Sequence, residues 1–116
     1  MACNSVDFYH LAGWLHLQPV LHGEAHVRTI ISRAYYSAFL VARDKAGITD
    51  DSPGVHQKVW SHYSSAGKTT LANRLEDLRL KRNRADYHMK LTMTSRDSGM
   101  ALAWARSILK ELGVAL

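Results

Sequence analysis

The chain contains very little cysteine, proline or glycine, and these shortages exclude several classes of protein. Among its 116 residues there are one cysteine (Cys3), two prolines and seven glycines. A single cysteine cannot form an internal disulfide, which excludes a disulfide-stabilised secreted scaffold. Scarce proline and glycine, together with 47% apolar residues, exclude a collagen-like or disordered chain. The composition therefore favours a packed globule.

Long apolar runs are also absent. No stretch approaches the roughly 20 consecutive apolar residues that span a bilayer. Residues 1–10 contain no Lys or Arg followed by an apolar run, so they lack the pattern of a secretory signal. We therefore expect a cytoplasmic protein. The length suits one core, and no repeat or linker divides the chain, so we expect a single domain over residues 1–116.

Apolar residues recur with the period of an α-helix, and no segment shows the alternation of a strand. The first helix is expected to be capped by Asn4 or Ser5 and to end before Pro19. The second begins near Glu24 and carries a continuous apolar stripe, until Gly47 supplies a left-handed stop. This second helix is expected to be the longest.

Three more helices complete the expected fold. Ser52 followed by Pro53 predicts a cap with proline at the first helical position, opening a helix that ends near Gly67. Two further helices are expected over about residues 71–88 and 94–113. The sequence therefore predicts an all-α fold, an antiparallel helical bundle of four to five helices.

Positive charge is in excess and is partly concentrated in one segment. Fifteen Lys and Arg against ten Asp and Glu give a formal net charge of +5. Residues 74–90 contain six basic and three acidic residues, so about +3 of this excess lies there. Such a segment is typical either of a surface that binds a polyanion or of an ordinary solvated helix face.

Arg82 occupies a position where a core residue is expected. Counted at 100° per residue from Leu71, Leu75, Leu78 and Met89 fall within about 40° of zero, and Arg82 falls near 20°. A buried isolated guanidinium is costly, so Arg82 must meet a carboxylate, a cavity or another subunit. Asp86, four residues further on, would supply an ordinary intrahelical ion pair.

The residues after Arg82 carry a family resemblance. Arg82 is followed by Asn83 and, after five intervening residues, by His88. This pattern resembles the hallmark of the HEPN superfamily, an Arg, a polar residue and then a His, in helical domains that bind or cleave nucleic acid. Residues 33–39, Arg-Ala-Tyr-Tyr-Ser-Ala-Phe, resemble the helix that packs beside this motif in many prokaryotic HEPN domains.

The likeness extends over roughly residues 27–112 and implies a function. It implies a homodimeric, metal-independent endoribonuclease, either a toxin or an anti-phage defence effector, with a cognate antitoxin or regulatory protein as a further partner. One departure is clear: HEPN toxins paired with nucleotidyltransferase antitoxins have a Tyr two places after the His, where this chain has Lys90. Regulation through a modified tyrosine at that place is therefore not expected.

Arg and His suffice for such a reaction because RNA carries its own nucleophile, the 2′-OH. Arg82 is expected to hold the phosphate and His88 to transfer the proton. Asn83 and Asp86 are expected to support this pair, and no metal or cofactor is required. Three further cations are expected to contact the RNA backbone: Arg79, Arg84 and Lys90.

Helix geometry restricts how Arg82 and His88 can act together. On an unbroken helix they would lie about 9 Å apart along the axis and about 120° apart around it. Either the helix breaks near Tyr87, or a two-fold axis brings the motifs of two subunits into one cleft.

Two other functional interpretations remain open. One is a non-catalytic HEPN module that binds RNA, a nucleotide or a partner protein, and the other is a purely structural helical domain.

The remaining histidines give no strong indication of a site. His22 and His26 are four residues apart, but no third ligand has a matching spacing for zinc. His56 and His62 have no evident partner and are expected on a helix surface or in a cap.

Overall fold

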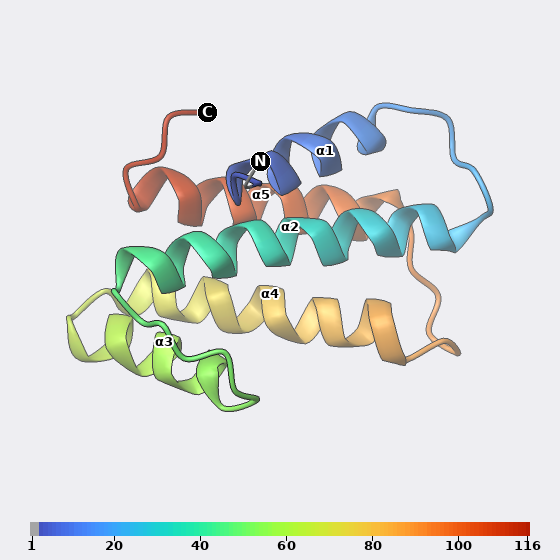
Figure 1. Ribbon diagram of the computed structural model, residues 1–116. Helices are drawn as coiled ribbons and strands as arrows, with labels where there is room; N and C mark the ends of the chain where they lie inside the picture. Colours follow the sequence, from blue (N-terminus) through green and yellow to red (C-terminus); the bar gives the residue numbers. More distant parts are fainter. Residues whose placement is uncertain (1–2) are drawn as a thin grey trace.

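Five helices make up all the regular structure that the computed structural model shows over residues 3–116, the part of the chain it describes. They are α1 (Val6–His16), α2 (Glu24–Lys45), α3 (Val55–Ser65), α4 (Thr69–Tyr87) and α5 (Ser95–Glu111) (Figure 1). The predicted all-α bundle is confirmed. Within the same residues, no helix has the length and apolarity needed to cross a membrane.

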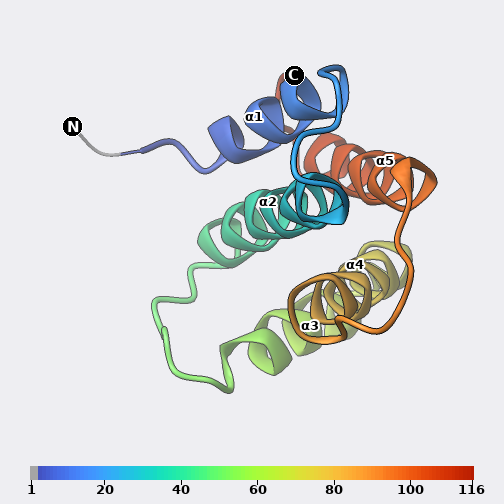
Figure 2. The ribbon, with the colours of Figure 1, turned by 90° about the vertical axis from the view of Figure 1, so that its right-hand side faces the viewer.

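Helix α2 is the centre of the bundle and contacts each of the other helices. It runs antiparallel to α1 and α4 and parallel to α5 (Figures 1 and 2). Twelve of its 22 residues are buried, including Ile30 and Ile31. Because this helix is covered on several sides, polar side chains within it must find partners inside the protein.

Helices α4 and α5 pack on α2 and supply much of the core. Leu71, Leu75 and Leu78 of α4 are completely buried, as their helical spacing predicts. Full burial of one such side chain contributes on the order of 2 kcal/mol. This stripe fixes the rotation of α4, so the residues that follow it in the same register also face α2.

The helix boundaries agree with the sequence except at α3. Gly47 has φ +71° and follows the end of α2, as expected. Pro53, by contrast, is not the first residue of α3, because the helix begins at Val55 after Gly54. Ser52 and Pro53 instead form a turn, in which the Val55 N–H donates to the Ser52 carbonyl at 3.0 Å.

A capping box starts α5 and connects it to α4. The Asp97 carboxylate accepts from the backbone N–H of Thr94 at 2.8 Å, and the two residues form a reciprocal cap. The other Asp97 oxygen accepts from Lys81 Nζ at 2.9 Å. Lys81 is thus a buried cation with a partner in the next helix, and it is not available to a ligand.

Candidate functional site

Arg82 faces α2, as predicted, and is held by contacts from both helices. Its Nη2 donates to the Tyr36 hydroxyl at 2.8 Å, and its Nη1 donates to Asn83 Oδ1 at 3.3 Å. Its Nε lies 2.9 Å from Asp86 Oδ2, but the N–H is not aligned for a hydrogen bond, so this contact is an ion pair. The predicted pairing of Arg82 with Asp86 is confirmed.

Tyrosine rings surround the Arg82 guanidinium. Its central carbon lies 5.4 Å, 5.2 Å and 5.6 Å from the ring centroids of Tyr35, Tyr36 and Tyr87. Burial disfavours the charged form, but the Tyr36 hydroxyl and the Asp86 carboxylate outweigh it and raise the pKa of Arg82. The guanidinium therefore stays cationic in a position that is only partly exposed.

A polar groove opens beside Arg82 between α2 and α4. Its volume is about 550 Å³, and we call it the Arg82 groove. Its polar and charged lining residues are Arg28, Thr29, Ser32, Arg33, Tyr36, Arg82, Asp86 and Tyr87. Ser32 donates to Asp86 Oδ2 at 3.3 Å and so fixes the carboxylate that accompanies Arg82. The groove thus presents cations with a single acidic residue among them.

His88 does not line the Arg82 groove. Helix α4 ends at Tyr87, one of the two alternatives that the sequence left open, and His88 is its exposed C-cap residue. Together with Lys90 it lines a separate hollow of about 460 Å³. Within one copy of the chain, the break therefore leaves the two expected catalytic residues in neighbouring hollows.

The sequence-based assignment of Met89 to the buried stripe is wrong. Met89 lies beyond the end of α4, and 64% of it is exposed. Extrapolating the helical angle to this residue fails because residues 88–91 form a turn, in which the Leu91 N–H donates to the His88 carbonyl at 3.2 Å.

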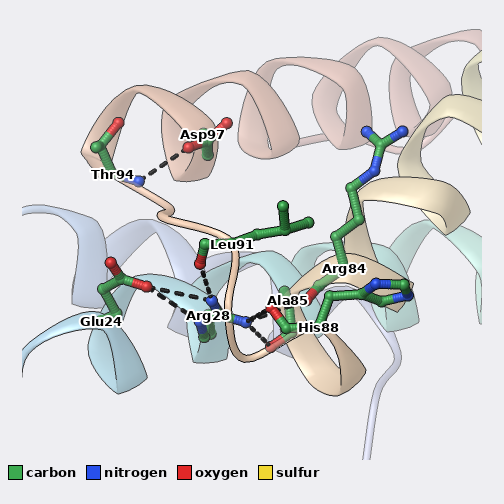
Figure 3. A network of polar contacts seen from close by, with 8 residues as sticks. All are labelled: Glu24, Arg28, Arg84, Ala85, His88, Leu91, Thr94 and Asp97. Carbon is green, nitrogen blue, oxygen red and sulfur yellow. Dashed lines mark hydrogen bonds and ion pairs between the residues drawn. The ribbon is translucent and has the colours of Figure 1, made fainter.

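A buried arginine that the sequence analysis overlooked holds this turn in place. Nη1 of Arg28 donates to the carbonyls of Arg84, Ala85 and His88 at 3.0, 3.0 and 3.2 Å (Figure 3). Its Nη2 donates to the Leu91 carbonyl at 2.5 Å. The guanidinium thus gives the Ala85 and Leu91 carbonyls a donor and closes the following turn on the helix. The Arg84 and His88 carbonyls, which also accept from the backbone N–H groups of His88 and Leu91, gain a second donor.

Glu24 completes this network from the preceding turn of α2. Its Oε2 lies 3.2 Å from Arg28 Nη2 and accepts from Nε at 3.4 Å. The His88 imidazole points away from the Arg28 guanidinium (Figure 3), so the network fixes the backbone of His88 and leaves its ring free. We refer to Arg28 and Glu24 as the α4 clamp.

The three cations expected to contact RNA are distributed over different surfaces. Arg84 and Lys90 are exposed, and Lys90 lies in the turn beside His88. Arg79 pairs with Glu76 at 3.3 Å and lines a cavity between α3 and α4. None of the three lines the Arg82 groove, whereas Arg33 does, with its guanidinium carbon 4.8 Å from the Tyr36 ring centroid.

His56 is a second residue whose role the sequence analysis missed. It was expected on a surface or in a cap, but its side chain is only 13% exposed and has two partners. Nδ1 lies 3.1 Å from the Tyr35 hydroxyl, and Nε2 lies 3.0 Å from Glu76 Oε2. Because a carboxylate only accepts, Nε2 carries the proton and Nδ1 accepts from Tyr35.

The hydrogen-bonded side chains of Tyr35, His56 and Glu76 are expected to make the free energy of unfolding depend on pH. Burial lowers the pKa of His56 below its ordinary 6.5, against the opposing effect of the Glu76 hydrogen bond. Burial also raises the pKa of the Tyr35 hydroxyl to about 12, so Tyr35 stays a donor. If His56 were protonated, its Nδ1 would become a donor and the Tyr35 hydroxyl would have to turn and accept from it.

We expect the His56 contribution to stability to be present above pH 6.5 and to be lost as pH falls through the lower pKa of the folded state. The measurement is the urea midpoint at pH 7.5 and at pH 5 for the wild type and His56→Gln. The wild-type midpoint should fall more than that of the variant, which has no imidazole at this position. Equal falls in the two proteins would contradict the assigned protonation state.

Over residues 3–116, no three His, Cys, Asp or Glu side chains converge in a way that would hold a metal ion. His22 and His26 do not share a ligand site, and His26 Nε2 instead lies 2.7 Å from the Leu15 carbonyl.

Scans of the chain against protein-family models, curated proteins and solved structures found no match.

Proposed function

We propose that this protein is a metal-independent endoribonuclease of the HEPN type, acting in the cytoplasm as a toxin or defence effector. The observation that carries the proposal is the Arg82 guanidinium, held cationic at a polar groove between two helices. The residues that resemble HEPN domains lie on the same two helices. The Arg82 to His88 motif lies at the end of α4, and residues 33–39 lie on α2.

Arg82 has the donors that a phosphate requires. Nη1 and Nη2 each make one hydrogen bond, to Asn83 and Tyr36. Each of these nitrogens carries a second N–H, so the fork keeps donors for a phosphate oxygen. Asp86 and Tyr36 orient the fork, and Asp86 offsets its charge when no RNA is bound.

His88 is the proposed proton-transfer group, and a second copy of the chain is part of the site. The exposed residues around the turn include large apolar side chains, with Tyr87 68%, Met89 64% and Leu91 45% exposed. A contact between two copies over this surface would bury them. We propose that in this contact His88 of one copy lies at the Arg82 groove of the other, since the two line separate hollows within a single copy.

The reaction needs no group beyond these. His88 takes the proton from the 2′-OH and returns it to the leaving 5′-oxygen, and Arg82 stabilises the charge that develops on the phosphate. The products are a 2′,3′-cyclic phosphate and a 5′-OH. DNA, which has no 2′-OH, is not cut. A nuclease of this kind would be restrained in the cell by an antitoxin or regulatory protein.

The test is incubation of purified protein with mixed cellular RNA in EDTA. The wild type is expected to cut RNA and to leave 5′-OH ends that polynucleotide kinase labels directly, whereas His88→Ala is expected to bind RNA without cutting it. Equal cleavage by both proteins would contradict the role of His88.

A second candidate function is RNA binding without cleavage. It is favoured by one observation, that His88 and Arg82 line different hollows of the same copy. In that case the wild type would retard RNA in a native gel and leave it intact. A protein that neither cuts nor binds RNA would instead favour the structural interpretation, in which the pair of Arg82 and Asp86 only stabilises the fold.

A further inference from the structure

A second cavity lies between α3 and α4, which run side by side at one edge of the bundle (Figures 1 and 2). Its volume is about 570 Å³. Its polar and aromatic lining residues are His56, Gln57, Trp60, Asn73, Glu76, Asp77 and Arg79. The residues expected to perform catalysis do not contribute to it, so its chemistry must be considered separately.

The inner wall of this cavity is a rigid network. Glu76 accepts from His56 Nε2 at 3.0 Å through one oxygen and from Arg79 Nη1 at 3.3 Å through the other. His56 is fixed in turn by the Tyr35 hydroxyl. A carboxylate oxygen accepts more than one hydrogen bond, so Glu76 keeps acceptor capacity although its position is fixed.

The rest of the wall supplies an aromatic surface and further polar groups. Trp60 packs against the core and is only half-buried, so part of its ring system remains available to a ligand. Asp77 is exposed, and its contact with Arg74 is a loose one of 3.8 Å. Aromatic surface combined with carboxylates and an arginine suits a planar ligand that has several N–H donors and also acceptors.

The position of the cavity relative to Arg82 indicates which larger molecule carries such a group. Glu76, Arg79 and Arg82 follow each other at intervals of three on α4, so each lies beside the next, and the row turns by about 120° around the axis from Glu76 to Arg82. Tyr35 connects the two ends, because its ring centroid lies 5.4 Å from the Arg82 guanidinium and its hydroxyl lies 3.1 Å from His56 Nδ1 in the cavity wall. Glu76 and Arg82 are about 9 Å apart along the axis. A single RNA strand with a phosphate at Arg82 therefore has a neighbouring base within reach of the cavity, with Arg79 between the two.

We propose that the cavity between α3 and α4 binds a guanine base of single-stranded RNA, an inference that rests on the proposed ribonuclease function. Guanine offers two adjacent donors, N1–H and the N2 amino group, which suit the carboxylates of Glu76 and Asp77. Its O6 and N7 are the acceptors that arginine recognises best, and Arg79 is in place for them. The other bases lack this pair of adjacent donors, so the cavity selects guanine.

The test measures binding in the His88→Ala background, which is not expected to cut RNA. Fluorescence anisotropy compares four short oligouridine strands that differ only at the central base, which is G, A, C or U. The strand with G is expected to bind about tenfold more tightly than the others. Asp77→Asn should remove this preference, whereas the control Asp7→Asn, an exposed aspartate in the first turn of α1, should keep it.

The failures of the two proposals are distinguishable. Equal affinity for the four strands, or a guanine preference that persists in Asp77→Asn, would overturn the guanine site and leave the proposed nuclease intact. If the wild type neither cuts RNA nor binds any of the four strands, the proposed function fails and the guanine site fails with it.

Discussion

Arg28→Ala is expected to lower the free energy of unfolding by about 3 kcal/mol, the order of cost of removing hydrogen bonds from a charged donor to buried and part-buried carbonyls. Arg28 donates to four backbone carbonyls at the end of α4 and pairs with Glu24. Alanine would leave the buried Ala85 carbonyl and the part-buried Leu91 carbonyl without this donor, whereas the Arg84 and His88 carbonyls would keep their backbone N–H donors. Urea denaturation followed by far-UV circular dichroism measures the change.

The control for this prediction is Arg106→Ala, which removes an exposed arginine from α5. A surface substitution of this kind is expected to change stability by no more than about 0.5 kcal/mol. Arg28→Lys should recover only part of the lost stability. Lysine has one donor nitrogen, whereas Nη1 and Nη2 of arginine reach carbonyls at the end of α4 and at Leu91 at the same time. If Arg28→Ala and Arg106→Ala unfold at the same urea concentration, the α4 clamp does not stabilise the fold.

The second large effect is expected at Arg82. Arg82→Ala should slow RNA cleavage about 10³-fold, in the range found when one donor to a developing negative charge is removed. Arg82→Lys keeps the charge but loses the bidentate fork, so it should recover only a small part of the rate. The measurement is the single-turnover rate at saturating RNA, made alongside a urea midpoint that verifies folding.

Arg84→Ala is the matched control, since it removes an exposed cation two residues away on the same helix. It is expected to weaken RNA binding and to reduce by about one the slope of log affinity against log salt concentration. The cleavage rate at saturating RNA should stay unchanged. A rate for Arg82→Ala close to that of Arg84→Ala would show that Arg82 contributes only general positive charge.

The sequence predicted the position of Arg82 because helical periodicity depends only on spacing along one helix. The spacing of Leu71, Leu75 and Leu78 defines which side of α4 faces α2, and both Arg82 and Asp86 follow in the same register. The pairing of these two residues is local, four positions apart, so it could be inferred without knowing how the helices pack.

The role of Arg28 could not be predicted in this way, because its partners are backbone carbonyls, which every residue type has. These carbonyls lie 56 to 63 residues further along the chain. One signal was available: Arg28, Ser32 and Tyr36 recur every four residues and form a polar stripe on a helix that is otherwise largely apolar. A stripe of this kind in a central helix indicates buried polar contacts with a neighbouring helix.

His56 was missed for a similar reason. Its partners, Tyr35 and Glu76, lie 21 and 20 residues away on different helices, and only the packing of α3 on α2 and α4 brings them together. The end of α4 was also uncertain from the sequence, because it depends on the capping by Arg28. Long-range polar contacts, rather than helix propensity, therefore determine where His88 lies.

Arg82 of one copy and His88 of another are proposed to act on the same phosphate. The direct measurement mixes Arg82→Ala and His88→Ala proteins, unfolds and refolds them together to exchange subunits, and assays RNA cleavage in EDTA. Half of the resulting dimers would be mixed, each with one of its two composite sites intact, so activity should return to about a quarter of the wild-type value. A mixture no more active than either variant alone would contradict the claim.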